Sequence, residues 1–148
     1  MNQQICTFFL DDQMYGLRVL QIQEVLRVQE FTEVPLAPPA VLGLLNLRGS
    51  IVTALDLRQR LGLPPNPHLE APLNVVAQTA KGLVSLRVDR IGEVVEINPE
   101  ETETPPGTLG ESLRNLLAGV VPLPTGLLLL IDLERTMELG SSNPKSGA

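Results

Sequence analysis

The chain has 148 residues and a formal net charge of −6; 43% of its residues are hydrophobic and only 3% are aromatic. This length suits one compact domain, or two very small ones that share a core filled by leucine, valine and isoleucine. The chain holds two lysines, and its arginines are scattered. No basic cluster is therefore available for phosphate groups, which argues against nucleic acid as a partner.

The cysteine and histidine counts limit the possible chemistry. Cys6 is the one cysteine and His68 the one histidine, so an internal disulfide, a thiolate metal cluster and a catalytic Cys–His pair are disfavoured. We expect Cys6 to be a buried thiol and His68 a solvated loop side chain. Phosphate-loop, dinucleotide-binding and serine-hydrolase motifs do not occur. The sequence therefore predicts no catalytic residue, no metal and no cofactor.

No segment has the features of a signal peptide or of a membrane span. The first residues lack a basic region followed by a long apolar run, and the longest apolar stretch, at 127–131, has only the length of a strand. We therefore expect a soluble, cytoplasmic protein.

In chain order, the first residues are expected to form short strands joined by polar turns. A strand at 5–10 ends at an Asp-Asp-Gln turn, and residues 14–19 form its hairpin partner. Residues 20–26 alternate apolar and polar side chains at first, so a strand and a single helical turn compete there. A further strand is expected at 30–34, where a proline ends it.

The segment LGLLNLRGSIVTALDLR, which comes next, predicts an apolar hairpin. Strands at 42–47 and 51–55 flank a polar turn in which Gly49 can adopt a positive φ without steric cost. Arg48 is placed at this apolar tip, where its guanidinium could bind a carboxylate in bidentate fashion or simply keep the turn soluble. Within the chain, Glu24 is the candidate partner.

The remainder of the chain has a similar rhythm of strands and turns. A short helix at 57–61 and a proline-rich irregular connection at 62–72 lead into the second half. The strands expected there are 73–78, 83–88, 91–97, 120–121 and 127–131, and the helices are 112–117 and 133–138. Asp132 is the expected N-cap of the last helix. The acidic stretch at 98–110 should be an exposed loop, and the tail at 140–148 should be disordered.

About ten short strands at intervals of roughly 8–12 residues, with little helix, are typical of small barrels or a sandwich rather than of strand–helix–strand units. Each half contains a hairpin, a polar turn and a run that ends in Asp-Leu, a pattern that suggests internal duplication. From the residues alone we expect an all-β fold of two small barrels.

Five ordered blocks stand out along the chain: FFL at 8–10 with YGL at 15–17, IQEV at 22–25, NLRG at 46–49 with IV at 51–52 and DLR at 56–58, VD at 88–89 with EV at 93–94, and LLLIDLE at 128–134. Together they resemble the signature of CheW-type chemotaxis coupling proteins, an adaptor family. The resemblance covers residues 5–137, almost the whole chain. Ser85 departs from the family pattern, which favours a small, glycine-like residue at that position.

The resemblance implies a fold and a domain organisation. It implies two intertwined five-stranded, SH3-like β-barrels around a shared hydrophobic core, with a short C-terminal helix. We expect one CheW-like domain at 1–139, with a first barrel at about 14–70 and a second at about 71–137, to which an N-terminal strand contributes.

The resemblance also implies a non-catalytic adaptor and its partners. These are the regulatory domain of a CheA-type histidine kinase and the cytoplasmic tip of a methyl-accepting chemoreceptor, at membrane-associated receptor arrays. A sister adaptor of type IV pilus motility or phototaxis would have the same fold, and the sequence does not separate these. From another class, a small hydrolase would use the carboxylates at 93–103.

The family motifs place candidate site residues on this chain. The coupling candidates, whose two charges are expected to pair, are Glu24, Asn46, Arg48 and Gly49. The receptor-groove candidates, which would line a shallow apolar cleft for a helical tip, are Ile22, Gly43, Val75 and Val94. As alternatives, the three aliphatic side chains are plain core residues and the glycine permits a strand bend.

Overall fold

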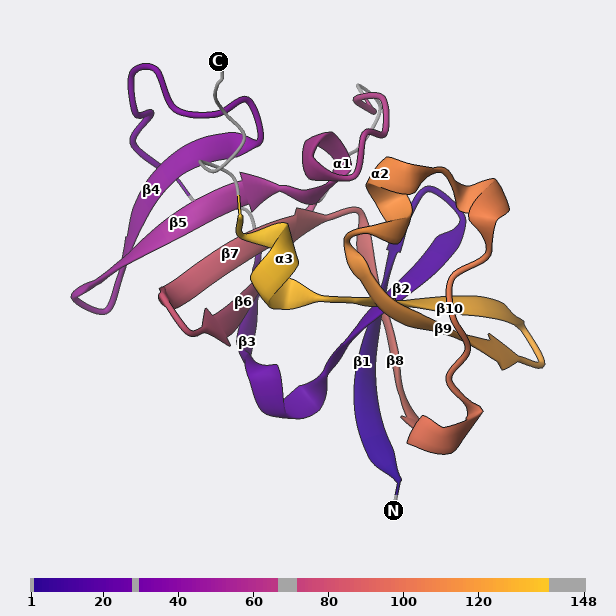
Figure 1. Ribbon diagram of the computed structural model, residues 1–148. Coiled ribbons are helices and arrows are strands. Elements are labelled where there is room, and N and C mark those ends of the chain that lie inside the picture. Colours follow the sequence, from indigo (N-terminus) through magenta and orange to yellow (C-terminus); the bar gives the residue numbers. More distant parts are fainter. Residues whose placement is uncertain (1, 28–29, 67–71, 139–148) are drawn as a thin grey trace.

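Ten short strands in two five-stranded sheets form most of the described chain, which comprises residues 2–27, 30–66 and 72–138 of this computed structural model (Figure 1). Sheet A consists of β1 (Gln3–Leu10), β2 (Gln13–Arg18), β8 (Arg90–Ile97), β9 (Leu117–Leu123) and β10 (Gly126–Ile131). Sheet B consists of β3 (Ile22–Arg27), β4 (Val41–Leu47), β5 (Ser50–Asp56), β6 (Leu73–Thr79) and β7 (Gly82–Val88). The all-β prediction of two five-stranded units is confirmed.

The two sheets have the same strand order and the same strand directions. Sheet A runs β8-β1-β2-β10-β9 and sheet B runs β3-β6-β7-β5-β4. Each sheet contains one parallel pair, β2 with β10 and β5 with β7, and its other pairs are antiparallel. The similar rhythm of the two halves of the sequence corresponds to this repeated architecture.

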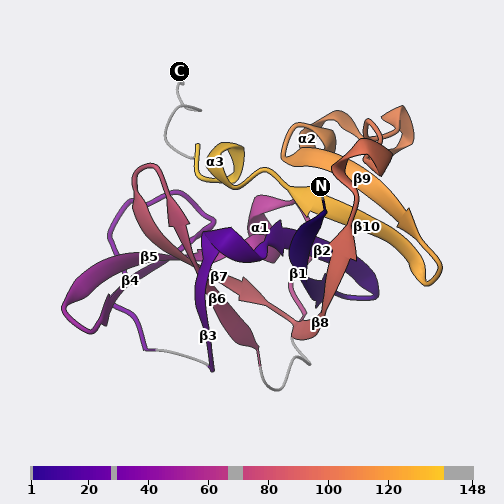
Figure 2. The same ribbon diagram turned by 90° about the horizontal axis from the view of Figure 1, so that it is seen from below.

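The chain passes from one sheet to the other twice, which intertwines them. β2 leads through the 3-10 helix η1 (Val19–Gln21) into β3, and β7 leads through Asp89 into β8. In Figures 1 and 2, sheet B lies on the left and sheet A on the right. The sheets do not follow the expected division into barrels at 14–70 and 71–137. β6 and β7 belong with β3–β5 because β7 pairs in parallel with β5, and β2 stays in sheet A because it pairs with β10.

Each sheet is an open barrel, because its two edge strands do not pair directly along their length within the described residues. A single bridge narrows each opening: Thr32, after β3, bridges to Leu44 of β4, and Glu103, after β8, bridges to Val120 of β9. The strand expected at 30–34 is therefore wrong; only one of its residues pairs, and the segment then bends into a proline-containing loop.

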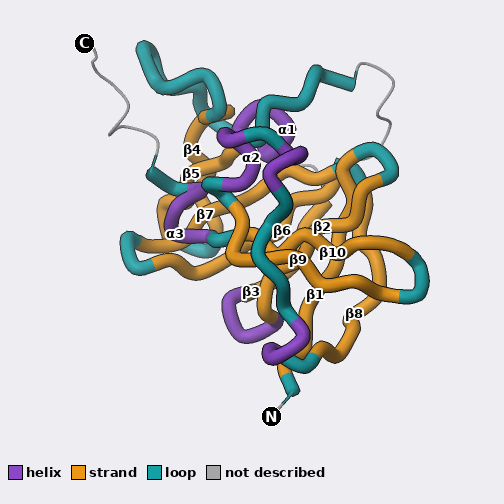
Figure 3. The backbone as a smooth tube through the Cα atoms, turned by 45° about the vertical axis from the view of Figure 1, so that its right-hand side comes forward, coloured by secondary structure: helices purple, strands orange, loops and turns teal. Residues whose placement is uncertain are grey.

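Helices are short and lie at the ends of strands. They are α1 (Leu57–Arg60), α2 (Glu111–Arg114) and α3 (Leu133–Thr136), with 3-10 helices η2 (Pro99–Glu101) and η3 (Gly107–Leu109). Figure 3 shows the three α-helices near one another, among the strands. The carboxylates of Asp56 and Asp132 accept hydrogen bonds from backbone N–H groups of α1 and α3, which confirms the N-cap expected at Asp132. A strand and a single helical turn were the alternatives for residues 20–26. Both occur, because the 3-10 helix η1 ends there and β3 follows it.

One aliphatic core joins the two sheets. It contains Phe8 and Leu129 from sheet A and Leu55 and Leu86 from sheet B, and none of these side chains is more than 3% exposed. Cys6 is buried as expected, and burial raises the pKa of its thiol. His68 and the tail at 140–148 lie outside the described residues. Both sheets therefore share one main core, each sheet has a smaller buried cluster of its own, and the accessible features lie on edges, turns and helices.

Candidate functional site

The tip of the β4–β5 hairpin is a two-residue turn whose geometry follows from its sequence. Leu47 pairs with Ser50, so Arg48 and Gly49 form the connection, with φ values of 52° and 89°. Positive φ at both central residues is the geometry of a type I′ turn, which matches the twist of the flanking strands. The Gly49 N–H donates a hydrogen bond to the Asn46 side-chain oxygen at 2.9 Å. Asn46 and Gly49 therefore shape the turn that presents Arg48.

Arg48 forms the predicted ion pair with Glu24, in bidentate geometry. Nη2 of Arg48 donates to Oε1 of Glu24 at 2.9 Å, and Nη1 donates to Oε2. The hydrogen bonds from Arg48 hold the pKa of the Glu24 carboxyl below its usual value, and the same bonds raise the pKa of the Arg48 guanidinium. The Arg48 side chain is nevertheless 68% exposed, whereas that of Glu24 is 20% exposed.

This ion pair spans the opening of sheet B. Glu24 lies on β3 and Arg48 follows β4, and these strands are the two opposite edges of the sheet. The bridge between Thr32 and Leu44 crosses the same opening farther from the hairpin tip. The charged pair joins the hairpin tip to edge strand β3, the bridge joins β4 to the segment that follows β3, and the hydrogen bonds to Glu24 orient the exposed guanidinium.

The outer face of the hairpin is apolar beside this charge. Leu45 and Val52 point into the interior of sheet B and are 5% and 0% exposed. Their neighbours Leu44 and Ile51 point outward and are 37% and 66% exposed. Alternation along each strand therefore fills the core with one face and presents the other face, with its apolar side chains, beside the Arg48 tip.

The four receptor-groove candidates do not form one site. Val75 is fully buried in the shared core, so it lines no accessible groove, and Ile22 is half-buried against the same core. Gly43 lies on β4, where a Cβ would come within 2.3 Å of the Thr32 carbonyl oxygen, so the glycine permits a close approach of two chain segments. Val94 is 56% exposed, but it lies on β8 of the other sheet.

A buried charge network that the sequence did not predict lies between the sheets. Arg58 of α1 is 6% exposed, and its Nη1 donates to Asp89 Oδ2 at 2.8 Å and to Asp11 Oδ1 at 2.9 Å. Its Nε donates to the Pro64 carbonyl at 2.9 Å. The hydrogen bond with Asp11, and then the negative charges of the neighbouring aspartates, raise the pKa of the Arg58 guanidinium, against the opposite effect of its burial. The DLR and VD motifs marked two of these residues, but only folding brings them together.

The described residues offer little for catalysis or metal binding. No group of three or more histidine, cysteine, aspartate or glutamate side chains in the described ranges could hold a metal ion. The glutamates at 93–103, the basis of the hydrolase alternative, lie exposed along β8, η2 and the following loop. Among the helices of the described chain, none is long and apolar enough to cross a membrane.

The fold and this surface define an all-β protein of two equivalent sheets whose most distinctive accessible feature is a charged hairpin tip. The family model of the CheW-like domain matches residues 4–140, and the chain belongs to this family of chemotaxis scaffold proteins.

Named relatives support this assignment. The chain is 29% identical over 141 residues to the chemotaxis protein CheW of Treponema pallidum, a match that covers 89% of this chain and 80% of that protein. It is 26% identical over 133 residues to a probable chemotaxis protein CheW of Rhizobium etli, covering 90% and 86%. Its fold is similar to the crystal structure of the scaffolding protein TtCheW from Thermoanaerobacter tengcongensis, with a TM-score of 0.85, 24% identity, and coverage of 97% and 93%.

Proposed function

We propose that this protein is a non-catalytic chemotaxis adaptor that couples the cytoplasmic tip of methyl-accepting receptors to the regulatory domain of a CheA-type histidine kinase, in the cytoplasm at membrane-associated receptor arrays. Membership in a family of chemotaxis scaffold proteins supports this function. The observation that carries it is the Arg48–Glu24 pair, because a guanidinium is held in one position and yet remains exposed.

The hairpin tip has the properties of a docking site for an acidic partner. A guanidinium carries five N–H donors, and the bidentate bond to Glu24 leaves others free to bind a second carboxylate. The exposed Leu44 and Ile51 beside it supply apolar area that a partner can bury. Because the surface is small, we expect modest affinity per contact and strength from many contacts in an array.

Capture of the cognate kinase regulatory domain by the purified full chain tests this function. Wild type should bind, and Arg48→Glu should weaken binding about tenfold or more, because it repels both Glu24 and an acidic partner. The matched control is Arg114→Glu, the same charge reversal at an exposed arginine on α2, which should bind as wild type does.

Two outcomes contradict the proposal. If the wild-type chain binds no CheA-type kinase of its own organism, the coupling function is wrong. If Arg48→Glu binds both kinase and receptor as wild type does, the coupling function does not use this tip. The same assay with receptor tips from swimming, twitching and phototaxis systems identifies the pathway in which the adaptor works.

A further inference from the structure

Two short helices each reach from their own sheet to a turn of the other sheet. α1 follows β5 of sheet B, and its Arg58 contacts Asp11, which lies in the β1–β2 turn of sheet A. α3 follows β10 of sheet A, and its Glu134 carboxylate accepts a hydrogen bond at 3.0 Å from the N–H of Ala80, in the β6–β7 turn of sheet B. We call these the Arg58 contact and the Glu134 contact.

The two contacts occupy equivalent places in the repeated architecture. The matching strand orders make β1–β2 equivalent to β6–β7, and β5 equivalent to β10. Arg58 and Glu134 each stand two residues after a capping aspartate. The backbone hydrogen bonds of the two capping aspartates match as well. The Asp56 N–H donates to the Ala40 carbonyl at 2.8 Å, and the Asp132 N–H donates to the Leu116 carbonyl at 2.9 Å. Each sheet thus contacts a turn of the other sheet through the helix that follows one of its strands. Sheet B makes this contact through the cation of Arg58, and sheet A makes it through the anion of Glu134.

In the Arg58 contact, the arginine side chain is buried and multiply bonded, whereas the Asp11 side chain is 52% exposed. Arg58 meets two carboxylates and a carbonyl, and Asp89 is 9% exposed. The Asp11 N–H also donates to Asp89 Oδ2, at 2.7 Å, which ties the turn to the same network. Charge-assisted bonds in a buried setting are strong, and opening them leaves buried charges without partners. The Arg58 contact is therefore the more rigid of the two contacts between the sheets.

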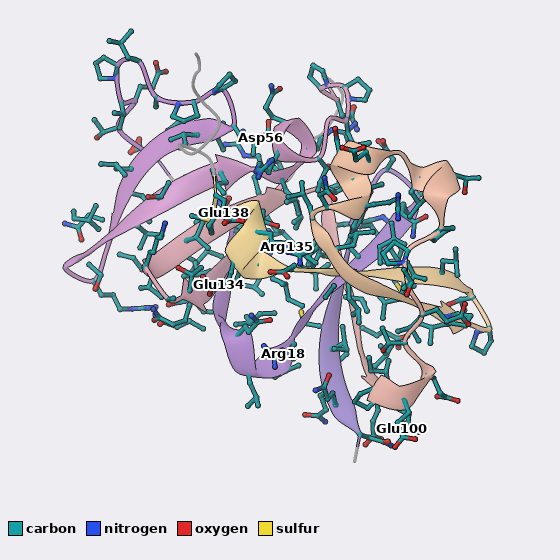
Figure 4. All side chains as sticks on the ribbon, in the orientation of Figure 1. Arg18, Asp56, Glu100, Glu134, Arg135 and Glu138 are labelled. Atoms are coloured by element: carbon teal, nitrogen blue, oxygen red, sulfur yellow. The ribbon has the colours of Figure 1, made fainter. Side chains whose placement is uncertain are left out.

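The Glu134 contact is exposed and made by one hydrogen bond. Figure 4 shows Glu134 on α3. The C-terminal end of this helix is held in addition by Arg60 of α1, whose Nε donates to the Thr136 carbonyl at 2.8 Å and whose Nη2 donates to the Arg135 carbonyl. Leu133 anchors the first turn in the core. A surface pocket of about 310 Å³ lies beside α3, and residues of β1, β2, η1, β9, β10 and α3 line it. The surface contact can therefore open without exposing the core.

We propose that the Glu134 contact is a releasable latch on the angle between the two sheets, and that the Arg58 contact is the pivot. When Glu134 leaves the β6–β7 turn, sheets A and B rotate slightly relative to each other about the Arg58 contact, while the core that they share stays packed. This device goes beyond the adaptor function, and its test uses no partner protein.

Spin labels on the two hairpin tips measure the angle between the sheets. The labels are attached in the full chain through Ser50→Cys, at the β4–β5 tip, and Thr125→Cys, at the β9–β10 tip, with Cys6→Ala as background. These tips extend to opposite sides of the molecule (Figure 1), so a small rotation gives a large change in distance. Glu134→Ala, which removes the acceptor of the Ala80 hydrogen bond, should broaden the distance distribution. The control Glu100→Ala makes the same substitution at an exposed glutamate of η2 and should leave the distribution as in wild type.

Amide hydrogen exchange locates the opening. In Glu134→Ala, the Ala80 amide should exchange about tenfold faster, whereas the Asp11 amide at the pivot and the urea midpoint of unfolding should not change. Arg60→Met, which keeps the apolar stem but removes the bonds to α3, should broaden the distribution further in the Glu134→Ala background.

Three results overturn the proposal. Faster exchange at Ala80 with an unchanged distance distribution means that the contact is only local. Loss of protection at Asp11 together with Ala80 means that the pivot is not at Arg58. Equal broadening by Glu100→Ala means that net charge, rather than this latch, sets the angle.

Discussion

Removal of the Arg58 guanidinium is the perturbation whose effect on stability the structure defines best. Arg58→Met keeps a side chain of similar length but deletes the cation that faces Asp11 and Asp89. Asp89 is 9% exposed, and its Oδ1 already has no hydrogen-bond partner among the described residues. In the variant, its Oδ2 keeps only the Asp11 N–H, so a buried carboxylate is left almost without compensation.

The magnitude follows from that uncompensated charge. Breaking a buried pair by removing one partner costs about 3–5 kcal/mol, and the lost bond to the Pro64 carbonyl adds to this. With an m value of about 2 kcal/mol per M urea, typical of a small domain, the urea midpoint should fall by about 2 M. Far-ultraviolet circular dichroism during urea unfolding measures this shift, provided that the m value is the same in both proteins.

Two further variants separate charge from packing. Arg60→Met removes the neighbouring arginine of α1, whose hydrogen bonds go to neutral carbonyls, and should cost only about 1 kcal/mol. Adding Asp89→Asn to Arg58→Met should recover part of the loss, because it removes the uncompensated charge. If the free energy of unfolding of Arg58→Met lies within about 1 kcal/mol of the wild-type value, the Arg58 network does not stabilise the contact between the sheets, and the reasoning is refuted.

Other predictions concern the interior and the hairpin tip. Val52→Ala and Leu55→Ala, at fully buried positions, should each lower the free energy of unfolding by about 2–4 kcal/mol in urea titrations; an unchanged midpoint would contradict the core assignment. Ser85→Ala removes a buried hydroxyl that has no hydrogen-bond partner among the described residues, and it should raise the free energy of unfolding by about 1 kcal/mol. A lower free energy of unfolding in this variant would show that the hydroxyl does form a hydrogen bond. Because Arg48 lowers the pKa of Glu24, the pair stabilises the fold above the pKa of an unfolded glutamate, and this stabilisation disappears as the pH falls through the lower folded pKa. An NMR titration of the Glu24 carboxyl in Arg48→Met should show its pKa rising, and an unchanged value would rule out the pair in solution.

The β4–β5 hairpin was predictable from sequence because its signals are local. Alternating apolar residues and a glycine in a two-residue connection define strands, turn and inward face over fewer than twenty residues. The family motifs supplied Glu24 as the partner of Arg48, and the structure joins the two side chains. The N-cap at Asp132 was predictable for the same reason, since a cap depends on neighbours in sequence.

The errors arise where distant residues decide the outcome. The segment at 30–34 has the composition of a strand, but only Thr32 finds an edge with which to pair. Val75 matched an apolar groove position, yet pairing of β6 between β3 and β7 places its side chain in the core. The partners of Arg58 are 31 and 47 positions away, so no local pattern could reveal its burial or its charge network.

The chain starts in sheet A, builds sheet B and then returns to sheet A, and this order has a consequence for how the protein folds during synthesis. Sheet B is complete once β7 has emerged, but β2 must wait for β10, and Gln13 and Leu127 are 114 positions apart. Until then the β1–β2 hairpin carries an unpaired edge, a state that favours slow folding and association with other unfinished chains. A shortened chain that ends before β10 therefore cannot complete sheet A, whose strands come from both ends of the described chain, whereas the five strands of sheet B follow one another without interruption.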